Sequence, residues 1–149
     1  MRIAQTRGGF TLVELIVVIV IVGIVALIAA PRFFSVGAYD ASRFHEAAIA
    51  AIRYAQKVAV AQHTDVYVVS TPTTSVALCY DAGCASPVKS PADSSAFVVT
   101  APAGISISGA SFNFNALGQP NSNIQRTLTV SGDVARQIVI EQETGYVHK

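Results

Sequence analysis

Few residues of this sequence have the types and the spacing that enzymes or metal sites use. The three histidines, His45, His63 and His148, lie far apart, and none has a second ligand four residues away, the spacing that places two metal ligands on one helical face. The sequence has no Gly-x-Ser-x-Gly elbow and no glycine-rich loop followed by lysine. We therefore expect no enzyme activity, no metal and no cofactor, and we expect the histidines on the surface.

Glu14 is the one carboxylate inside a long apolar run. The 21 residues from Phe10 to Ala30 are interrupted only by Thr11 and Glu14, and a helix that crosses a hydrocarbon core of ~30 Å needs about 20 apolar residues. We therefore predict a transmembrane helix over 10–31, in which a carboxylate costs roughly 2.5–3.5 kcal/mol and is a functional-site candidate. Two interpretations stay open: Glu14 reaches the membrane interface, or it pairs with a positive group such as a newly cleaved α-amino group.

The segment Met1–Gly9 before the run is short and basic and ends in two glycines. Arg2 and Arg7 favour the cytoplasmic side for this end, which places the rest of the chain across the membrane. An ordinary secretory signal peptide is a poor alternative, because no Ala-x-Ala cleavage site precedes Pro31 and the run exceeds the usual length of roughly 7–15 residues. We expect a single-pass inner-membrane protein with a periplasmic domain.

Composition limits the partners. Of the 149 residues, 52% are hydrophobic and 13% are charged, so the chain is long enough for one domain with an appendage and too apolar to be intrinsically disordered. Ten Lys and Arg against nine Asp and Glu give a formal net charge of +1, and the basic residues are scattered. Because nucleic-acid binding needs a concentrated basic surface, we do not expect nucleic acid as the main partner.

Cys79 and Cys84 are the two cysteines, with four residues between them. Two thiols are too few for a closed zinc site of the cysteine type, but they suffice for a disulfide if the domain lies in an oxidising compartment. The alternative is a pair of free, inert thiols. Asp81 lies within this loop and indicates a turn, because the other carboxylates that a calcium site needs are missing.

The residues after the apolar run predict an amphipathic helix over 32–63. Apolar residues recur there at spacings of three and four. The polar residues mostly turned away from this face are Arg43, Glu46, Arg53, Gln56 and Lys57. Pro31 does not forbid one continuous helix, because a proline inside a helix removes one hydrogen bond and bends it. A helix from about Phe10 to Gln62 would be ~80 Å long. The apolar positions are Phe44, Ala48, Ala51, Ala55, Val58 and Ala59.

Beyond Thr64 the apolar period changes from 3.6 to 2, which is typical of strands. The apolar segments are short and are separated by Pro, Gly, Asn, Asp and Ser. We predict an antiparallel sheet with one face against the helix, in a β-rich domain over 64–149. The expected strands are 66–69, 76–78, 97–99, 105–107, 112–114, 128–130, 138–140 and 146–147.

The stretch GGFTLVEL at the start of the apolar run resembles the class III signal of type IV pilins and type II secretion pseudopilins. A glycine before the cut, a phenylalanine after it, a glutamate at the fifth mature position and a proline ending the apolar stretch occur in register. The resemblance implies that a prepilin peptidase cleaves between Gly9 and Phe10 and N-methylates Phe10. It also implies that Glu14 pairs with the N-terminus of a neighbouring subunit, in an assembly helix that ends at Pro31.

Later segments narrow this resemblance to the GspH/FimT group of minor pilins and pseudopilins. The segments are 44–57, 112–120, 138–140 and 144–147. Taken over its whole length, the chain is most similar to the minor pilins of MSHA pili. One feature departs from the major pilins, because the two cysteines enclose a four-residue loop in mid-domain, whereas major pilins usually close a long C-terminal loop.

The group implies an α+β fold of the type IV pilin kind, with a long N-terminal helix packed on an antiparallel sheet. Other pilin or pseudopilin subunits would be its partners through the N-terminal helix, together with the prepilin peptidase and the inner membrane, and the assembled protein would lie in a pilus. The expected parts are a removed leader (1–9), a transmembrane and assembly helix (10–31), an amphipathic helix (32–63) and a periplasmic β-rich domain (64–149).

Two classes of function stay open. In the first, the chain is a structural subunit that joins or primes a pilus-like filament. In the second, the same anchor tethers a recognition module that binds DNA, a surface or a secreted substrate at a filament tip. An exposed aromatic patch or a basic groove at the tip of the domain would favour recognition, whereas a featureless tip with apolar flanks would favour assembly.

Overall fold

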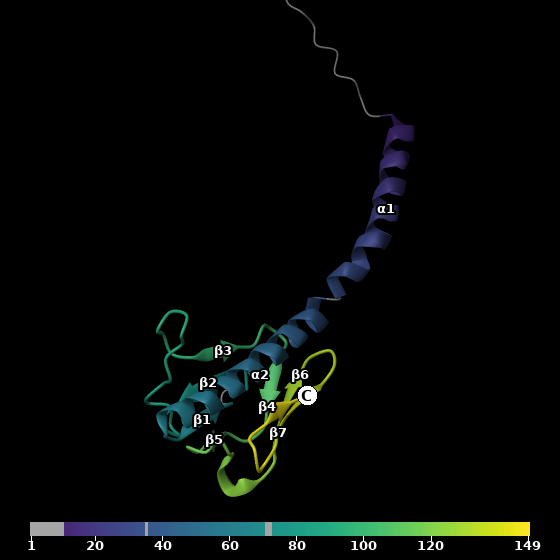
Figure 1. The fold of residues 1–149 in the computed structure, drawn as a ribbon. Coiled ribbons are helices and arrows are strands. Elements are labelled where there is room, and N and C mark those ends of the chain that lie inside the picture. The colour runs from purple at the N-terminus through teal and green to yellow at the C-terminus, as the bar shows by residue number, and fades with distance from the viewer. Residues whose placement is uncertain (1–10, 35, 71–72) are drawn as a thin grey trace, which may run out of the picture. The chain divides into compact units, whose positions relative to one another are not determined.

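The computed structural model describes residues 11–34, 36–70 and 73–149. The chain divides into two units, with the boundary after Val36. The first unit contains helix α1 (Leu12–Phe34), and the second contains almost all of helix α2 (Val36–Gln62) and eight strands (Figure 1). The single helix that the sequence predicts would pass through Ser35, which lies outside the described residues, so continuity at this point stays a prediction.

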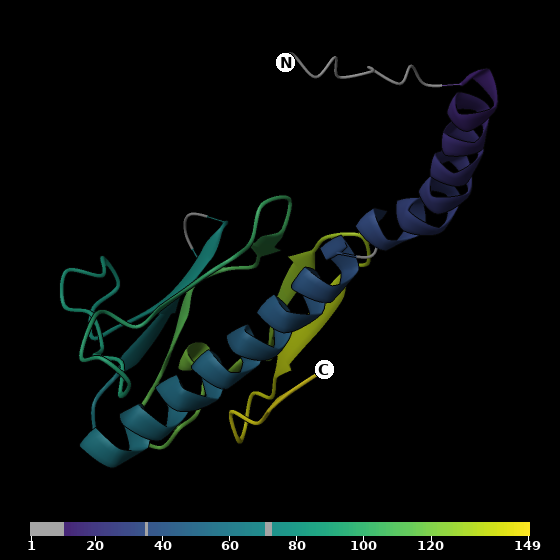
Figure 2. The same cartoon turned by 90° about the horizontal axis from the view of Figure 1, so that it is seen from above.

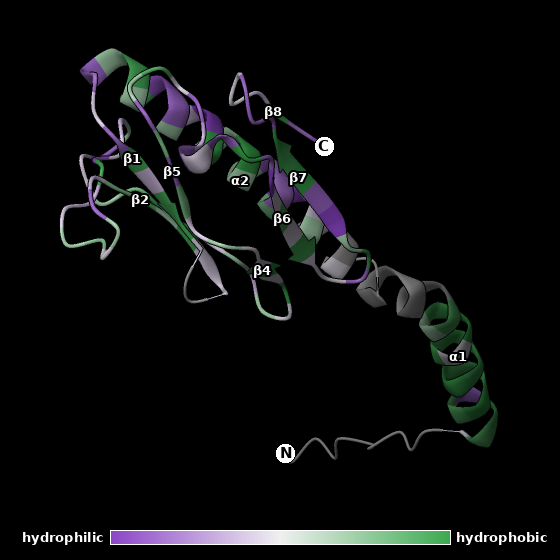
Figure 3. Ribbon diagram, turned by 90° about the horizontal axis from the view of Figure 1, so that it is seen from below, coloured by the Kyte–Doolittle hydropathy of each residue, from purple (hydrophilic) through white to green (hydrophobic). Residues whose placement is uncertain are grey.

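Helix α1 is apolar on all sides. Each of its residues from Leu12 to Leu27 is exposed, and the part of α1 coloured in Figure 3 is hydrophobic almost throughout. Pro31 lies within α1. In the part of the chain that the structure describes, no helix combines the length and the hydrophobicity that crossing a membrane requires. The span predicted over 10–31 begins at Phe10, outside these residues, and stays a prediction from the sequence.

Helix α2 is amphipathic, as its apolar spacing predicts. All six apolar positions selected from the sequence are buried, four of them alanines, while Arg43, Glu46, Arg53 and Lys57 are exposed. Because alanine side chains are short, the strands can lie close to the axis of this helix, and larger residues from the sheets fill the space between them.

The eight strands form two four-stranded sheets, and the antiparallel pairing predicted from the sequence is confirmed. The first sheet has the order β3-β2-β1-β5 and the second the order β4-β6-β7-β8. The first sheet contains β1 (Val66–Val69), β2 (Ser75–Cys79), β3 (Val98–Thr100) and β5 (Phe112–Phe114). The second contains β4 (Ser106–Ser108), β6 (Arg126–Ser131), β7 (Arg136–Ile140) and β8 (Val147–His148).

Each predicted strand corresponds to an observed strand, with ends that differ by one or two residues in most cases. The alternation of apolar residues identifies a strand and its buried face, but it does not specify the neighbouring strand. The chain leaves the first sheet for β4 and returns to it for β5, and this exchange depends on the loops. A short 3₁₀ helix (Asn121–Asn123) lies between β5 and β6.

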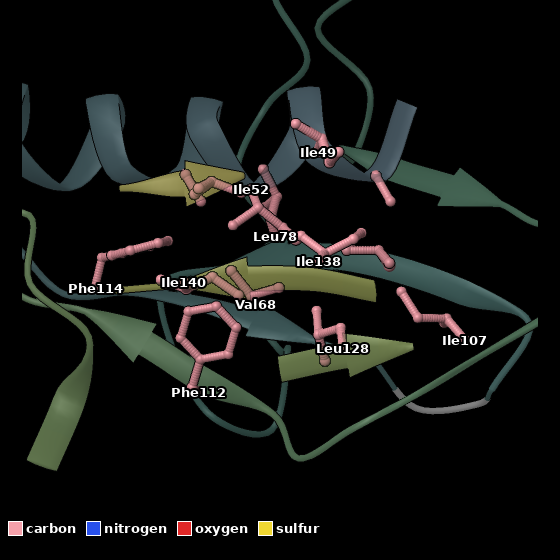
Figure 4. Close-up of a cluster of buried hydrophobic side chains, with 14 of the residues drawn as sticks. Ile49, Ile52, Val68, Leu78, Ile107, Phe112, Phe114, Leu128, Ile138 and Ile140 are labelled. Atoms are coloured by element: carbon pink, nitrogen blue, oxygen red, sulfur yellow. The ribbon is translucent and has the colours of Figure 1, made fainter. Parts of the chain in front are cut away.

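The core is one hydrophobic cluster shared by α2 and both sheets. Figure 2 shows α2 lying along the sheets, and Figure 4 shows the large side chains that meet beneath it. Burying an aliphatic or phenyl side chain of this size contributes about 1.5–3 kcal/mol. The largest fully buried side chains are Phe114, Ile52, Leu78, Ile107, Leu128, Ile138 and Ile140.

His45 is buried in α2, so the expectation that it lies on the surface was wrong. Its side chain is 3% exposed, and Nε2 lies 3.0 Å from the carbonyl oxygen of Gln137 in β7. Because a carbonyl only accepts hydrogen bonds, Nε2 is the donor, and this bond offsets the cost of burying the imidazole. His45 lies four residues from both Ala41 and Ile49 on the buried face, so the helical period contained the signal.

Candidate functional site

The first turn of α1 holds Glu14, the carboxylate singled out from the sequence. Thr11 precedes the helix, and its Oγ1 accepts a hydrogen bond from the Glu14 N–H at 3.2 Å. The Thr11 carbonyl accepts from the Leu15 N–H, also at 3.2 Å. This is half of a capping box, in which a Thr cap is followed three residues later by Glu. The cap was not predicted, although the spacing Thr-x-x-Glu is visible in the sequence.

The cap places the Glu14 carboxylate where the helix dipole favours a negative charge. Glu14 is exposed and sits on a helix whose described side chains are otherwise apolar or small. Gly9 and Phe10, the predicted cleavage and methylation residues, lie outside the described residues. What the structure describes is therefore a capped acidic turn followed by an apolar helix that has no polar face.

Besides His45, two polar side chains of α2 bind backbone carbonyls in the last part of the chain. Arg53 donates to the Val147 carbonyl from Nη2 at 2.7 Å and from Nε at 3.2 Å. Gln56 Nε2 donates to Gly118 and Thr144 carbonyls at 2.9 and 2.8 Å. These bonds hold the two-residue strand β8 and two loops against the helix. Periodicity alone marked Arg53 and Gln56 as solvent-facing, because it does not show where a long side chain ends.

His148 in β8 pairs with Glu141, the first residue after β7. His148 Nε2 lies 2.8 Å from Glu141 Oε1, and both side chains are partly exposed. The hydrogen bond to Glu141 raises the pKa of His148, and the same bond, with one from Gln125, lowers the pKa of Glu141. The ring of Tyr146 stacks on His148 with the ring centres 5.5 Å apart. His63, the third histidine, is exposed.

Cys79 and Cys84 are joined by a disulfide, with their Cα atoms 5.1 Å apart. Cys79 is the last residue of β2 and is fully buried, whereas Cys84 lies in the following loop and is partly exposed. Asp81 occupies the centre of this loop and accepts backbone hydrogen bonds from Ala85 and Ser86. The loop is therefore a compact, covalently closed turn at the end of β2.

A hollow of about 420 Å³ lies between α2, β7 and the end of the chain. It contains charges of both signs, and Lys149 Nζ lies 2.6 Å from Glu46 Oε1 at its rim. Within the described parts of the chain, no cluster of three or more His, Cys, Asp or Glu side chains could hold a metal ion. The hollow is lined by Ser42, His45, Glu46, Arg136, Gln137 and Lys149.

The exposed aromatic residues of the domain are isolated from one another. Tyr39 is 66% exposed near the start of α2, where Arg43 lies over its ring at 5.7 Å. Tyr146 is 59% exposed beside His148, between β7 and β8. These side chains stand on different elements, and we find no aromatic patch in the part of the domain that the structure describes.

Comparisons with known proteins agree with this arrangement. Residues 5–30 match the family model of the prokaryotic N-terminal methylation motif. This match includes the two glycines, Phe10, the capped turn with Glu14 and most of α1. The search of curated proteins found no match for the chain.

Two solved structures share the fold. The type IV minor pilin FimU of Pseudomonas aeruginosa is similar with a TM-score of 0.55 and 16% identity, over 72% of this chain and 85% of that one. The minor pseudopilin EpsH from the Type 2 Secretion System of Vibrio cholerae is similar with a TM-score of 0.51 and 12% identity, over 75% of this chain and 94% of that one. The protein thus carries an N-terminal methylation motif and has the type IV pilin fold, an N-terminal helix with an antiparallel β domain.

Proposed function

We propose that the protein is a minor subunit of a type IV pilus-like filament or pseudopilus, in which it contributes to assembly or priming. The observation that carries the proposal is α1, an apolar helix with one carboxylate in its capped first turn, most of which lies within the methylation motif. A helix that is apolar on every face needs apolar surroundings on every face. Lipid supplies these surroundings before assembly, and the helices of neighbouring subunits would supply them afterwards.

Maturation would proceed by cleavage between Gly9 and Phe10, catalysed by a prepilin peptidase, with N-methylation of Phe10. Support comes from the two glycines, the basic leader and the match over residues 5–30. The test is the intact mass of the protein purified from membranes, which should equal that of residues 10–149 plus one methyl group. Retention of Met1, or a start near Ala30, would exclude this role. Gly9→Leu should leave an uncut precursor.

Before assembly, the precursor would lie in the inner membrane with residues 10–31 as a single span, Met1–Gly9 in the cytoplasm and residues 32–149 in the periplasm. The basic leader supports this orientation, and the disulfide between Cys79 and Cys84 suits an oxidising compartment. A cysteine-reactive reporter that does not cross membranes tests it. Such a reporter should label Ala82→Cys in cells whose outer membrane is permeabilised.

The filament system would be an MSHA-type pilus. This part rests on the resemblance of the chain, taken over its whole length, to MshC, a minor pilin of MSHA pili. The decisive experiment is immunoprecipitation of this protein from sheared filaments, followed by mass spectrometry of the co-purified subunits. MSHA subunits in the precipitate would support the assignment, and subunits of a secretion pseudopilus in their place would contradict it.

Recognition of DNA, a surface or a secreted substrate is the second candidate. Exposed Tyr146 is the observation in its favour, because a fixed aromatic ring can stack on a ligand. We prefer assembly because no other exposed aromatic side chain of the described domain lies beside this ring, and the hollow lined by Arg136 and Lys149 also contains Glu46. The test is the variant Tyr146→Ala. Filaments that assemble normally with this variant but no longer attach to a surface or take up DNA would favour recognition.

A further inference from the structure

The disulfide loop contains a second closure that does not involve sulfur. Cys79 ends β2, and the chain returns so that the Tyr80 N–H donates to the Ser86 carbonyl at 2.8 Å. Asp81 lies inside this return. Its carboxylate accepts the Ala85 N–H on Oδ1 at 2.9 Å and the Ser86 N–H on Oδ2 at 2.6 Å. These bonds close the segment 80–86 by themselves.

The negative charge of the Asp81 carboxylate strengthens these hydrogen bonds. The backbone N–H groups of Ala85 and Ser86, and more weakly those of Gly83 and Cys84, lower the pKa of its carboxyl. Hydrogen bonds to an ionised acceptor are stronger than neutral ones. A cluster of successive N–H groups around one anion is the arrangement called a nest. Ionised Asp81 therefore favours the conformation in which residues 83–86 surround it.

This conformation includes an unfavourable backbone angle at one of the two cysteines. Cys84 has φ of 57°, in the left-handed region that residues with a Cβ atom avoid. The Cys84 N–H donates to the Asp81 carbonyl at 3.1 Å, and the next two N–H groups point at the carboxylate. The contacts with Asp81 thus fix Cys84 on both its N-terminal and its C-terminal side.

We propose that Asp81 is the positioning residue of the disulfide, and that it folds the 80–86 loop so that the Cys84 thiol faces Cys79 before the bond forms. With glutathione disulfide as oxidant, the thiolate of partly exposed Cys84 attacks one glutathione sulfur and releases one glutathione thiolate. The thiolate of buried Cys79 then attacks the Cys84 sulfur of the mixed disulfide and releases the second. Two protein thiols are oxidised, and one glutathione disulfide is reduced to two thiols.

The test compares the wild type with Asp81→Asn and with Asp93→Asn, each as the full chain in detergent. Asp93 is a matched control, because it lies in the same connection between β2 and β3 and accepts hydrogen bonds from the Ser95 N–H and hydroxyl. The measured quantity is the equilibrium between dithiol and disulfide in glutathione buffers of known composition. Asn keeps one acceptor but points an NH₂ donor at the second N–H. We expect the effective thiol concentration to fall about ten-fold in Asp81→Asn and to stay unchanged in Asp93→Asn.

Hydrogen exchange of the reduced proteins separates positioning from general damage to the loop. In reduced wild type the Ala85 and Ser86 amides should remain protected, because Asp81 and not the disulfide holds them. In reduced Asp81→Asn the amide that loses its acceptor oxygen should exchange freely, while amides of β1 and β2 keep their protection. Equal effective concentrations in wild type and Asp81→Asn would overturn the proposal. So would Ala85 and Ser86 amides that exchange freely in the reduced wild type.

Discussion

At the scale of single residues, two separate parts of Glu14 have a role, its backbone N–H and its carboxylate, and the sequence alone does not distinguish the two roles. Its backbone N–H is bound by Thr11 at the start of α1, and its carboxylate is the acidic group in an apolar helix. The hydrogen bond of the backbone N–H stabilises the helix itself, and the proposed ion pair of the carboxylate links neighbouring subunits. Variants that remove one and keep the other can distinguish them.

Replacing Glu14 with Gln or Leu should leave membrane retention equal or better, since a charge that is costly to insert has been removed. Incorporation into filaments should fall, because the α-amino group of a neighbouring subunit would be left unpaired in a low dielectric. The measurement is the ratio of this protein in sheared filaments to that in membranes. Thr11→Ala is the control, since it costs the helix about 0.5–2 kcal/mol through the lost cap but keeps the carboxylate. If a correctly cleaved Glu14→Gln protein enters filaments as well as the wild type does, Glu14 only reaches the membrane interface and does not pair with a neighbouring subunit.

The pair of Glu141 and His148 makes the stability of the β7–β8 hairpin depend on pH. The pKa of His148 is raised above its ordinary value of 6.5. Protonated His148 therefore stabilises the folded state fully below about pH 6.5, and this contribution is lost as the pH rises through the raised pKa. The pKa of Glu141 is lowered below its ordinary value of 4.5, so its stabilisation is lost as the pH falls. Thermal unfolding should show the largest difference between wild type and His148→Gln between about pH 4.5 and 6.5. His63→Gln, at an exposed site, should keep the wild-type profile, and a pH-independent difference for His148→Gln would contradict the pairing.

At the scale of elements, α2 contacts the two sheets with two types of residue, small apolar ones and long polar ones. Its alanines allow the strands to approach, while Arg53 and Gln56 bind the carbonyls of β8 and the neighbouring loops. His45 does the same for the carbonyl of Gln137. The helix therefore fixes the edge of the second sheet with hydrogen bonds and its interior with close packing.

Ala48 and Ala50 test the close packing within one helix. Ala48 is fully buried and Ala50 is exposed. Ala48→Leu should lower the free energy of unfolding by about 1–3 kcal/mol, because the added atoms enter a filled core. Ala50→Leu should change it by no more than about 0.5 kcal/mol. Urea unfolding of both variants provides the comparison, and equal effects would show that the core beneath α2 has room to spare.

At the scale of the whole molecule, the unit before Gly37 and the unit from Gly37 onward have separate sources of stability. The hydrophobic core consists of residues from Ala41 to Val147, so the second unit contains all of it. The first unit exposes its apolar residues over Leu12–Leu27. Folding and assembly would therefore depend on different parts of the chain.

A fragment of residues 37–149 should consequently fold alone and unfold in one cooperative transition. Its β-strand content by circular dichroism should match that of the domain in the full chain. It should not enter filaments, since it lacks the helix through which we expect assembly. Recovery of the fragment in sheared filaments from cells that also make the wild type would show that domain contacts suffice for recruitment.

Much of the fold could be predicted because it depends on local patterns. Apolar residues three and four apart selected the face of α2 that is buried, from Phe44 to Ala59. Alternation located all eight strands, and the two glycines before Phe10 with Glu14 identified the methylation motif. These features require only that a side chain be apolar, small or charged at a given spacing along the chain.

Tertiary structure alone decided the features that depend on distant partners. The division into two sheets follows from which strands pair, and β4 pairs with β6 across a gap of 17 residues between them. Arg53 and Gln56 are polar and lie where solvent was expected, yet they bind carbonyls 62 to 94 residues away in the chain. The helical period places His45 on the buried face, but only the tertiary structure shows that the Gln137 carbonyl accepts a hydrogen bond from its ring. The periodicity of apolar residues predicts which face of a helix or strand is buried. It contains no information about which distant backbone group a polar side chain will contact.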